Sequence, residues 1–362
     1  MSLASRLPDF PWDTLADART RAEAHPDGLV DLSVGTPVDP TPALAQEALQ
    51  QASEAPGYPT TWGTPELRAS IIDYLERRWQ SPGLQDPNVL PVIGTKELVA
   101  WMPLLLGLDA DSAVVFPSCA YPTYEVGARV AGAEPVPLDD PERVPENTGL
   151  IWINSPANPS GRILSAEEMR AWVAASRRTG AVLASDECYG EFAWEAEPFS
   201  VLDPRINDGE RRNIVAVHSV SKRSNAAGYR AGFVAGCKGV VGQLLEARKH
   251  LGMMVPAPVQ AAMAAMLSDQ DHVEEQRERY LSRRATLKPA LEGAGFRIDH
   301  SEGSLYLWAT RDEPCRDSVA WLAERGILVA PGDFYGPNSA RHVRVALTAT
   351  DERIQAAASR LG

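Results

Sequence analysis

The sequence predicts an α/β protein: a large domain built on a mostly parallel, mixed sheet, followed by a smaller α+β domain. Short apolar runs alternate with helical patterns between residues 97 and 236, and this alternation is typical of a parallel sheet covered by helices. The runs are apolar at nearly every position, as strands buried on both faces should be. After about residue 240, long helical segments precede short strands, which indicates a second domain.

The elements follow one another in a clear order. We expect helices at 65–79, 97–108 and 165–180, and strands at 112–117, 149–155, 181–187, 213–221, 231–236, 304–310 and 342–348. The helix at 165–180 has the sharpest limits, because Ser165 and Glu168 form a capping-box pattern and Gly180 can end it. Residues 1–39, rich in Pro and Asp, are interpreted as an arm that contributes to the small domain. The large domain is expected over 40–270 and the small domain over 271–362.

Composition excludes several classes of protein. A chain of 362 residues exceeds what one core usually supports, and a net charge of -13 argues against nonspecific nucleic-acid binding. There is no apolar run long enough to cross a membrane and no signal-peptide core at the N-terminus. Four cysteines without CxxC spacing favour a reduced cytoplasm, and six histidines form no ligand-spaced pair. We therefore expect a cytoplasmic protein with no metal site and no nucleic-acid or membrane partner.

Polar side chains gather where consecutive predicted strands end. Asn158 follows the strand at 149–155, Asp186 and Tyr189 follow the strand at 181–187, and Lys222 follows the run from Asn213. In open α/β sheets, ligands bind outside the carboxyl ends of the parallel strands. These side chains are therefore expected at one edge of the sheet.

A phosphate group would suit the residues around that lysine. Ser219 and Ser221 offer hydroxyl donors and Arg230 offers a guanidinium. Upstream, Thr95 and Lys96 begin an apolar helix, and a helix N-terminus is a ready anion site.

A lysine beside a phosphate site, with an aspartate and a tyrosine nearby, is the set of groups that pyridoxal phosphate requires. Lys222 can condense with the aldehyde as a Schiff base. Asp186 can pair with the pyridinium nitrogen and keep the ring an electron sink. Tyr189 and Asn158 can hydrogen-bond the ring's phenolate oxygen.

In these stretches the chain resembles the class I and II aminotransferases of pyridoxal-phosphate fold type I. The matching motifs are "NPSG" at Asn158, "SDECYGEF" at Asp186 and "SVSKRSNAAGYRAGF" at Lys222. The resemblance covers essentially the whole chain. It implies a transaminase with ping-pong amino transfer, in which Lys222 moves a proton at the substrate's Cα. It also implies a cis bond between Asn158 and Pro159.

Three further stretches extend the resemblance. "DLSVGTP" implies that Gly35 meets the substrate carboxylate, and "HVRVALT" implies that Arg344 clamps it with help from Asn158. "YPTTWGTPELR" implies that Tyr58 reaches the cofactor phosphate of a neighbouring subunit, and so predicts a homodimer with shared active sites. The family's ring-stacking aromatic falls on Cys119 in strict alignment; the "YPTY" pattern gives that role to Tyr121 instead.

The substrate is implied only by a narrower resemblance. The stretches around Lys222 and at 120–133 are similar to bacterial N-succinyldiaminopimelate aminotransferases of lysine biosynthesis, with glutamate and 2-oxoglutarate as the donor pair. Alternatives are an aspartate, aromatic or broad-specificity aminotransferase, a carbon–sulfur lyase on the same fold, and a cofactor-binding sensor without turnover. A transcription regulator would need a DNA-binding module, for which the arm leaves no room.

Each candidate also has an ordinary interpretation. Lys222, Arg230 and Arg344 could be surface cations, Asp186 a helix cap, Asn158 and Gly35 turn residues, and Thr95 with Lys96 a plain helix start. The tyrosines at 58, 121 and 189 could be packing or interface residues. Arg223, next to the lysine, could point away into a salt bridge and is given no chemical role.

Overall fold

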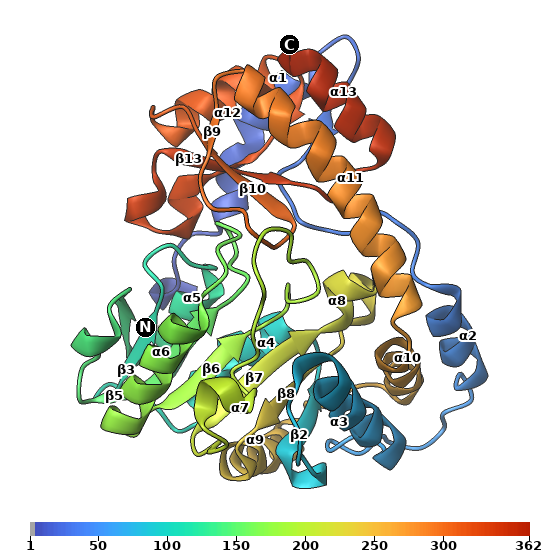
Figure 1. Cartoon of the computed structure of the whole chain (residues 1–362), viewed down its shortest axis with the longest axis vertical. Coiled ribbons are helices and arrows are strands. Elements are labelled where there is room, and N and C mark those ends of the chain that lie inside the picture. Colours follow the sequence, from blue (N-terminus) through green and yellow to red (C-terminus); the bar gives the residue numbers. More distant parts are fainter. Residues whose placement is uncertain (1–3) are drawn as a thin grey trace.

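Residues 4–362, which the computed structural model describes, form a seven-stranded, a four-stranded and a two-stranded β-sheet with helices around them (Figure 1). The seven-stranded sheet has the order β2-β8-β7-β6-β5-β3-β4. Its strands are β2 (Val89–Val92), β3 (Ala113–Phe116), β4 (Glu134–Pro137), β5 (Thr148–Asn154), β6 (Val182–Asp186), β7 (Ile214–Ser219) and β8 (Gly232–Gly236). Only β8 runs antiparallel to its neighbours β2 and β7. The mostly parallel, mixed sheet predicted from the sequence is confirmed.

The central strands are apolar on both faces because each face has its own core. On β5, Ile151 and Ile153 belong to one hydrophobic cluster, whereas Leu150 and Trp152 belong to another on the opposite face. The covering helices are α3 (Pro65–Trp79), α4 (Thr95–Leu105), α5 (Thr123–Ala131), α6 (Ala166–Thr179), α9 (Lys238–Leu251) and α10 (Ala257–Ser268). Helices α3, α6 and α10 contribute to the first cluster, and α4, α5 and α9 to the second.

The four-stranded sheet is antiparallel, in the order β12-β13-β10-β9, and has a third hydrophobic cluster. Its strands are β9 (Arg297–Ile298), β10 (Tyr306–Thr310), β12 (Ala330–Pro331) and β13 (His342–Ala346). The surrounding helices are α1 (Ala16–Glu23), α11 (Asp271–Gly293), α12 (Cys315–Ala323) and α13 (Asp351–Leu361). The N-terminal segment joins this part of the molecule, because β1 (Val30–Asp31) pairs in parallel with β11 (Ile327–Leu328).

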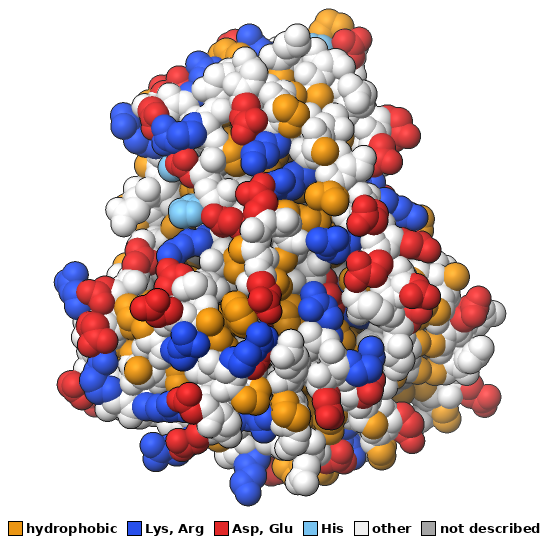
Figure 2. All heavy atoms as spheres, in the orientation of Figure 1, with side chains coloured by type: hydrophobic (Ala, Val, Ile, Leu, Met, Phe, Trp, Pro, Cys, Tyr) orange, Lys and Arg blue, Asp and Glu red, His pale blue; other side chains and the backbone are white. Residues whose placement is uncertain are grey.

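Helix α11 links the two parts of the molecule. It starts near α10 and α2 (Ala43–Gln51) beside the large sheet and extends to α13 beside the small one (Figure 1). Acidic and basic side chains are interspersed over the face seen in Figure 2. The domain limits near residues 39 and 270 stay a prediction.

The element boundaries differ from the sequence prediction at two informative places. The strand predicted at 213–221 ends at Ser219, where the chain enters the short helix α8 (Val220–Arg223), so Lys222 lies on a helical turn. Helix α4 begins at Thr95 rather than at residue 97, because Gly94 occupies the N-cap position with φ 78°. Helix α6 matches its prediction, with the reciprocal Ser165–Glu168 capping box and Gly180 at its C-cap.

No helix within residues 4–362 is both long and apolar enough to cross a membrane. The same residues contain no group of three or more His, Cys, Asp or Glu side chains arranged to hold a metal ion.

Candidate active site

The carboxyl ends of three adjacent strands bring the predicted residues to one edge of the large sheet. Strands β5, β6 and β7 run in parallel, with Asn154 opposite Asp186 and Asp186 opposite Val217. Tyr189 lies in the turn after β6, and Lys222 on the helical turn after β7. The sheet topology therefore explains why residues far apart in the sequence can act together.

Lys222 is a partly buried cation at this edge. Ser219 caps α8 by accepting a hydrogen bond of 3.1 Å from the Ser221 N–H, which fixes the turn that carries the lysine. The Lys222 ammonium donates to the backbone carbonyl of Gly35. Burial lowers the pKa of Lys222, and the positive charge of Arg344 acts in the same direction. A lysine with a lowered pKa has more of the neutral amine that attacks a carbonyl.

Asp186 is a buried carboxylate with only neutral hydrogen-bond donors. The Tyr124 hydroxyl donates to one oxygen at 2.9 Å, and the Cys188 N–H donates to the other at 3.2 Å. Burial raises the pKa of Asp186, although both hydrogen bonds oppose the rise. Among residues 4–362 no cation forms an ion pair with it. A buried carboxylate in this position suits a protonated ring nitrogen, which would supply the missing positive charge.

Arg344 supplies a buried guanidinium with unused donor capacity. It lies on β13 and is 3% exposed. It donates to Asn158 Oδ1 at 2.9 Å and to the Ser33 carbonyl at 2.7 Å, while its Nε has no hydrogen-bond partner among the described residues. The guanidinium lies 4.0 Å from the centre of the Tyr306 ring. This geometry suits a carboxylate ligand, which accepts from two guanidinium nitrogens at once.

Asn158 is held in place by its backbone. The Asn158–Pro159 peptide bond is cis, as the sequence analysis predicted. The Asn158 N–H donates to Asn154 Oδ1 at 2.7 Å, and Asn154 Nδ2 in turn donates to the Asp186 carbonyl at 2.8 Å. The Asn158 amide therefore faces Arg344 from a loop tied to the end of β6.

The predicted phosphate ligands converge on the N-terminus of α4. A Cβ on Gly94 would lie 2.4 Å from an Arg230 guanidinium nitrogen, so the glycine leaves room for that side chain beside the helix start. A Cβ on Gly232 would lie 3.1 Å from Thr95 Cγ2 and 3.4 Å from Ser219 Cα, so those two residues are also neighbours. Arg230 forms no ion pair with a carboxylate anywhere in the described chain. These donors suit a phosphate group.

Lys96 lies at the margin of this group. It is exposed, and its ammonium lies 5.8 Å from the centre of the Phe10 ring on the N-terminal segment. It forms no ion pair with any described residue, so its charge is available to an incoming anion.

Tyr121 approaches the site from the loop after β3. Burial raises its pKa to about 12, and the nearby Asp186 adds to this rise. Its ring meets the Tyr124 ring edge to face, with centroids 5.8 Å apart. Cys119, the other position considered for a ring-stacking residue, is half-buried.

Tyr58 is the one predicted residue that the single chain leaves apart from the others. Its side chain is 99% exposed, and no contact within residues 4–362 joins it to the site. An exposed aromatic of this kind is what a contribution to a neighbouring subunit would require.

Sequence reasoning missed several residues of the site. Tyr124 hydrogen-bonds Asp186, and Asn154 hydrogen-bonds the backbone of Asn158. Both had a signal in the sequence, because Tyr124 stands inside the quoted "YPTY" motif and Asn154 lies near the end of the strand predicted at 149–155. Tyr306 meets both Tyr189 and Arg344. Its only signal was its place in the predicted strand at 304–310, because its partners come from distant segments.

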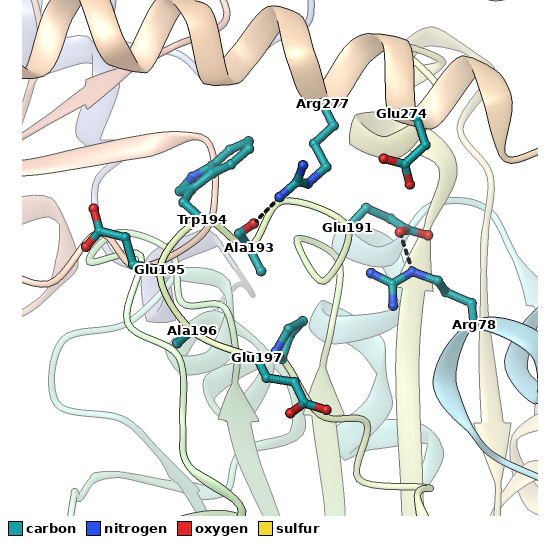
Figure 3. Close-up of a pocket in the computed structure, with 10 residues that line it drawn as sticks. Arg78, Glu191, Ala193, Trp194, Glu195, Ala196, Glu197, Glu274 and Arg277 are labelled. Carbon is teal, nitrogen blue, oxygen red and sulfur yellow. Dashed lines mark hydrogen bonds and ion pairs between the residues drawn. The ribbon is translucent and has the colours of Figure 1, made fainter.

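A separate cavity lies away from these residues. It has a volume of 530 Å³ and contains none of the predicted site residues (Figure 3). Its wall includes Glu191, which pairs with Arg78 at 2.8 Å and with the buried Arg223 at 3.4 Å. Arg223 therefore points away from the Lys222 amine into a buried ion pair, which is the interpretation considered from the sequence.

Comparison with known proteins agrees with this geometry. The model of the family "Aminotransferase class I and II" matches residues 27–361. The chain is 59% identical to the probable aminotransferase Rv1178 of Mycobacterium tuberculosis, over 99% of this chain and 86% of that protein. It is 55% identical to the 4-dedimethylamino-4-oxo-anhydrotetracycline transaminase OxyQ of Streptomyces rimosus, over 98% and 99%. An LL-diaminopimelate aminotransferase of Aquifex aeolicus is 32% identical, over 92% and 90%.

Solved structures give the same result for the fold. An aminotransferase from Neisseria meningitidis superposes with a TM-score of 0.89 at 28% identity, covering 99% of this chain and 98% of that one. One from Staphylococcus aureus has a TM-score of 0.89 at 26% identity, covering 100% and 98%. The chain therefore belongs to the class I and II aminotransferases, pyridoxal-phosphate enzymes of fold type I.

Proposed function

We propose that this aminotransferase is an N-succinyl-LL-2,6-diaminopimelate:2-oxoglutarate aminotransferase, with glutamate and 2-oxoglutarate as its donor pair. The observation that best supports an amino-acid substrate is the buried guanidinium of Arg344, which has an unpartnered Nε and lies beside Asn158. The finer assignment rests on the sequence pattern around Lys222.

The cofactor-binding residues are proposed from the same geometry. Bound pyridoxal phosphate supplies the electron sink that stabilises negative charge at the substrate's Cα. Lys222 would attach the cofactor and carry the proton from Cα. Asp186 would hold the ring nitrogen, and Tyr189 with Asn158 the phenolic oxygen. The phosphate would be bound by Ser219, Ser221, Arg230, Thr95, Lys96 and Tyr58 of the neighbouring subunit, and the ring face would lie against Tyr121.

A long dicarboxylate substrate needs a second cation for its far carboxylate. The basic residues that could fill this role are Arg19, Arg21, Lys96, Arg129 and Arg223. Four of them are already paired with acidic side chains: Arg19 with Asp31, Arg21 with Glu324, Arg129 with Glu125 and Arg223 with Glu191. Lys96 remains without an ion pair among the described residues. It is therefore our candidate for the distal carboxylate, as an alternative to the phosphate.

A second candidate substrate is a polycyclic ketone. It is favoured by the 55% identity to OxyQ over nearly the whole of both chains, which exceeds the identity to the diaminopimelate aminotransferases. The ion pairs of Arg19, Arg21, Arg129 and Arg223 also favour an acceptor with few charges, because they leave only Lys96 of these five basic residues unpaired among the described residues.

The test compares acceptors on the purified, cofactor-loaded enzyme with glutamate as donor. The acceptors are the N-succinyl keto acid, oxaloacetate, phenylpyruvate and 4-dedimethylamino-4-oxo-anhydrotetracycline. We expect kcat/KM for the succinylated acceptor to exceed that of the others by roughly a hundredfold, since unpaired polar groups reject analogues that lack the second carboxylate. Equal or greater kcat/KM with another acceptor would overturn the assignment, and turnover of any acceptor refutes a sensor without activity.

Lys96→Gln refines the same experiment. If Lys96 binds the far carboxylate, the variant should lose roughly tenfold or more in kcat/KM for the succinylated acceptor only. Lys238→Gln, at another exposed helix start, is the matched control and should change nothing. An equal loss with every acceptor would indicate that Lys96 serves the phosphate instead.

A homodimer with shared active sites and a cytoplasmic location belong to the same proposal. The dimer is motivated by the exposed Tyr58 ring and by the prevalence of twofold assemblies. The location is motivated by the spacing of the cysteines.

A further inference from the structure

Two buried tyrosine hydroxyls meet beside Lys222. Tyr306 lies on β10 of the small sheet, and Tyr189 follows β6 of the large one. Their hydroxyl oxygens are 2.9 Å apart, and their rings are inclined at 66° with centroids 5.6 Å apart. The pair therefore forms a direct polar link between the two parts of the molecule at the active site.

Gly35 connects this pair to the lysine. Its carbonyl accepts the hydrogen bond from the Lys222 ammonium, while its Cα faces Tyr306. A Cβ at position 35 would lie 2.1 Å from the Tyr306 hydroxyl oxygen and 2.7 Å from the ring. The Tyr306 hydroxyl thus occupies space that only a glycine at position 35 leaves free, against the residue that holds the Lys222 amine.

The surroundings of the pair shift the pKa values of the two tyrosines in opposite directions. Burial alone would raise the pKa of Tyr306, but Arg344, Lys222 and the hydrogen bond with Tyr189 lower it. Burial and the neighbouring Tyr306 raise the pKa of Tyr189. Tyr306 is therefore the more acidic phenol, and Tyr189 donates when Tyr306 gives up its proton. The other titratable groups on which Tyr306 acts are Tyr121, Tyr280 and Tyr335.

We propose that Tyr306 is a positioning residue of the aminotransferase site, which orients the Tyr189 hydroxyl and favours the protonated form of the Lys222 nitrogen. The proposal is independent of the acceptor, because every amino acid must pass through the same lysine. It follows from the contact of Tyr306 with Tyr189 and Gly35. The Tyr306 oxygen influences Lys222 in the direction that raises the pKa of that lysine.

The direction of the effect can be worked out for Tyr306→Phe. The substitution keeps the ring over Arg344 and removes only the hydroxyl. Lys222 then loses a partner that stabilises its charged form, and Tyr189 becomes free to donate elsewhere. Both changes favour the unprotonated form of the nitrogen that joins Lys222 to the cofactor. The pKa of this nitrogen should therefore fall.

The measurement is the visible absorption of the pyridoxal-phosphate-loaded protein, without substrate, as a function of pH. For Tyr306→Phe we expect the midpoint pH of this absorption change to fall by roughly half to one pH unit, which is the size of a single hydrogen-bond contribution. Tyr335→Phe is the matched control, because its buried hydroxyl has no hydrogen-bond partner among the described residues. An unchanged midpoint in Tyr306→Phe, or an equal fall in Tyr335→Phe, would overturn the proposal.

Gly35→Ala provides a second variant, in which neither tyrosine is replaced. Its Cβ must displace the Tyr306 hydroxyl, so the midpoint should fall in the same direction, and less so when Tyr306→Phe is already present. If Tyr306 had only a structural role, Tyr306→Phe would change the melting temperature and the cofactor occupancy but not the midpoint of the loaded protein. That result would also refute the proposal.

Discussion

At the scale of single residues, the arrangement around Arg344 shows how this enzyme can combine burial with binding. A buried guanidinium that lacks a carboxylate partner is costly, since its desolvation is only partly offset by the Asn158 and Ser33 oxygens and the tyrosine rings. A substrate carboxylate would complete the ion pair. The same reasoning applies in reverse to Asp186, a buried carboxylate for which the cofactor would supply the cation.

Replacing Arg344 tests this interpretation. We expect Arg344→Gln to reduce kcat/KM for glutamate by roughly a hundredfold or more, because a charge-assisted contact of about 3 kcal/mol is lost. Arg344→Lys should recover only part of this, since lysine keeps the charge but cannot form the bidentate contact. Arg341→Gln, an exposed arginine just before the same strand, is the control. The interpretation fails if Arg344→Gln keeps kcat/KM within about threefold of the original enzyme while the cofactor remains bound.

At the scale of elements, the sequence predicted the buried strands well and the edge strands poorly. Strands β5, β6 and β7 are continuous apolar runs followed by polar residues, and each was expected within two residues of its observed limits. The strands β2 ("VLPV") and β4 ("EPVP") were not expected, because proline weakens a strand pattern. They lie at the two edges of the sheet, where a missing N–H is tolerated.

The residues of the candidate site, too, were only partly predictable from the sequence. Lys222, Asp186 and Asn158 could be predicted because they follow strands and stand in short motifs. The contact between Tyr189 and Tyr306 could not, since the two residues are 117 positions apart and no local pattern marks their hydroxyls. The direction of the Arg223 side chain could not be predicted either. It depends on the ion pair with Glu191, which also pairs with Arg78 on α3, and only the folded chain brings these residues together.

The capping box of α6 offers a quantitative test at this scale. Ser165 accepts from the Glu168 N–H at 3.2 Å, and Glu168 accepts from the Ser165 N–H at 2.8 Å. Ser165→Ala should lower the free energy of unfolding by ~1 kcal/mol in urea titrations at neutral pH. Ser359→Ala, inside the exposed surface of α13, is the control and should have little effect.

The pH dependence of this variant has a defined sign. Burial would raise the pKa of Glu168, but the hydrogen bonds from Ser165 and the charge of Arg162 lower it. A carboxylate with a lowered pKa contributes stability above its unfolded pKa of about 4.3 and loses it as the pH falls through the folded value. The difference between Ser165→Ala and the original protein should therefore shrink in acid. A constant difference down to about pH 2 would contradict the role of the Glu168 charge.

At the scale of the whole molecule, one chain brings most of the predicted site residues together, whereas Tyr58 stands apart from them. The two sheets meet at the active site through Tyr189, Tyr306, Asn158 and Arg344, so that motion between them would alter the substrate contacts directly. The exposed Tyr58 ring has no such role within the chain. A second copy of the chain is the partner that the family resemblance implies for it.

Subunit mixing tests whether the active sites are shared. We expect Lys222→Ala to be inactive because it lacks the amine that attaches the cofactor, and Tyr58→Phe to be impaired because it lacks a phosphate donor. If Tyr58 acts across the interface, a hybrid dimer has one site with both lesions and one with neither. Random exchange of equal amounts should then restore about a quarter of the original activity, since half of the dimers are hybrids with one intact site. If Tyr58 serves its own subunit, every site in the hybrid carries a lesion, and activity stays at the average of the two variants despite exchange confirmed by mass spectrometry.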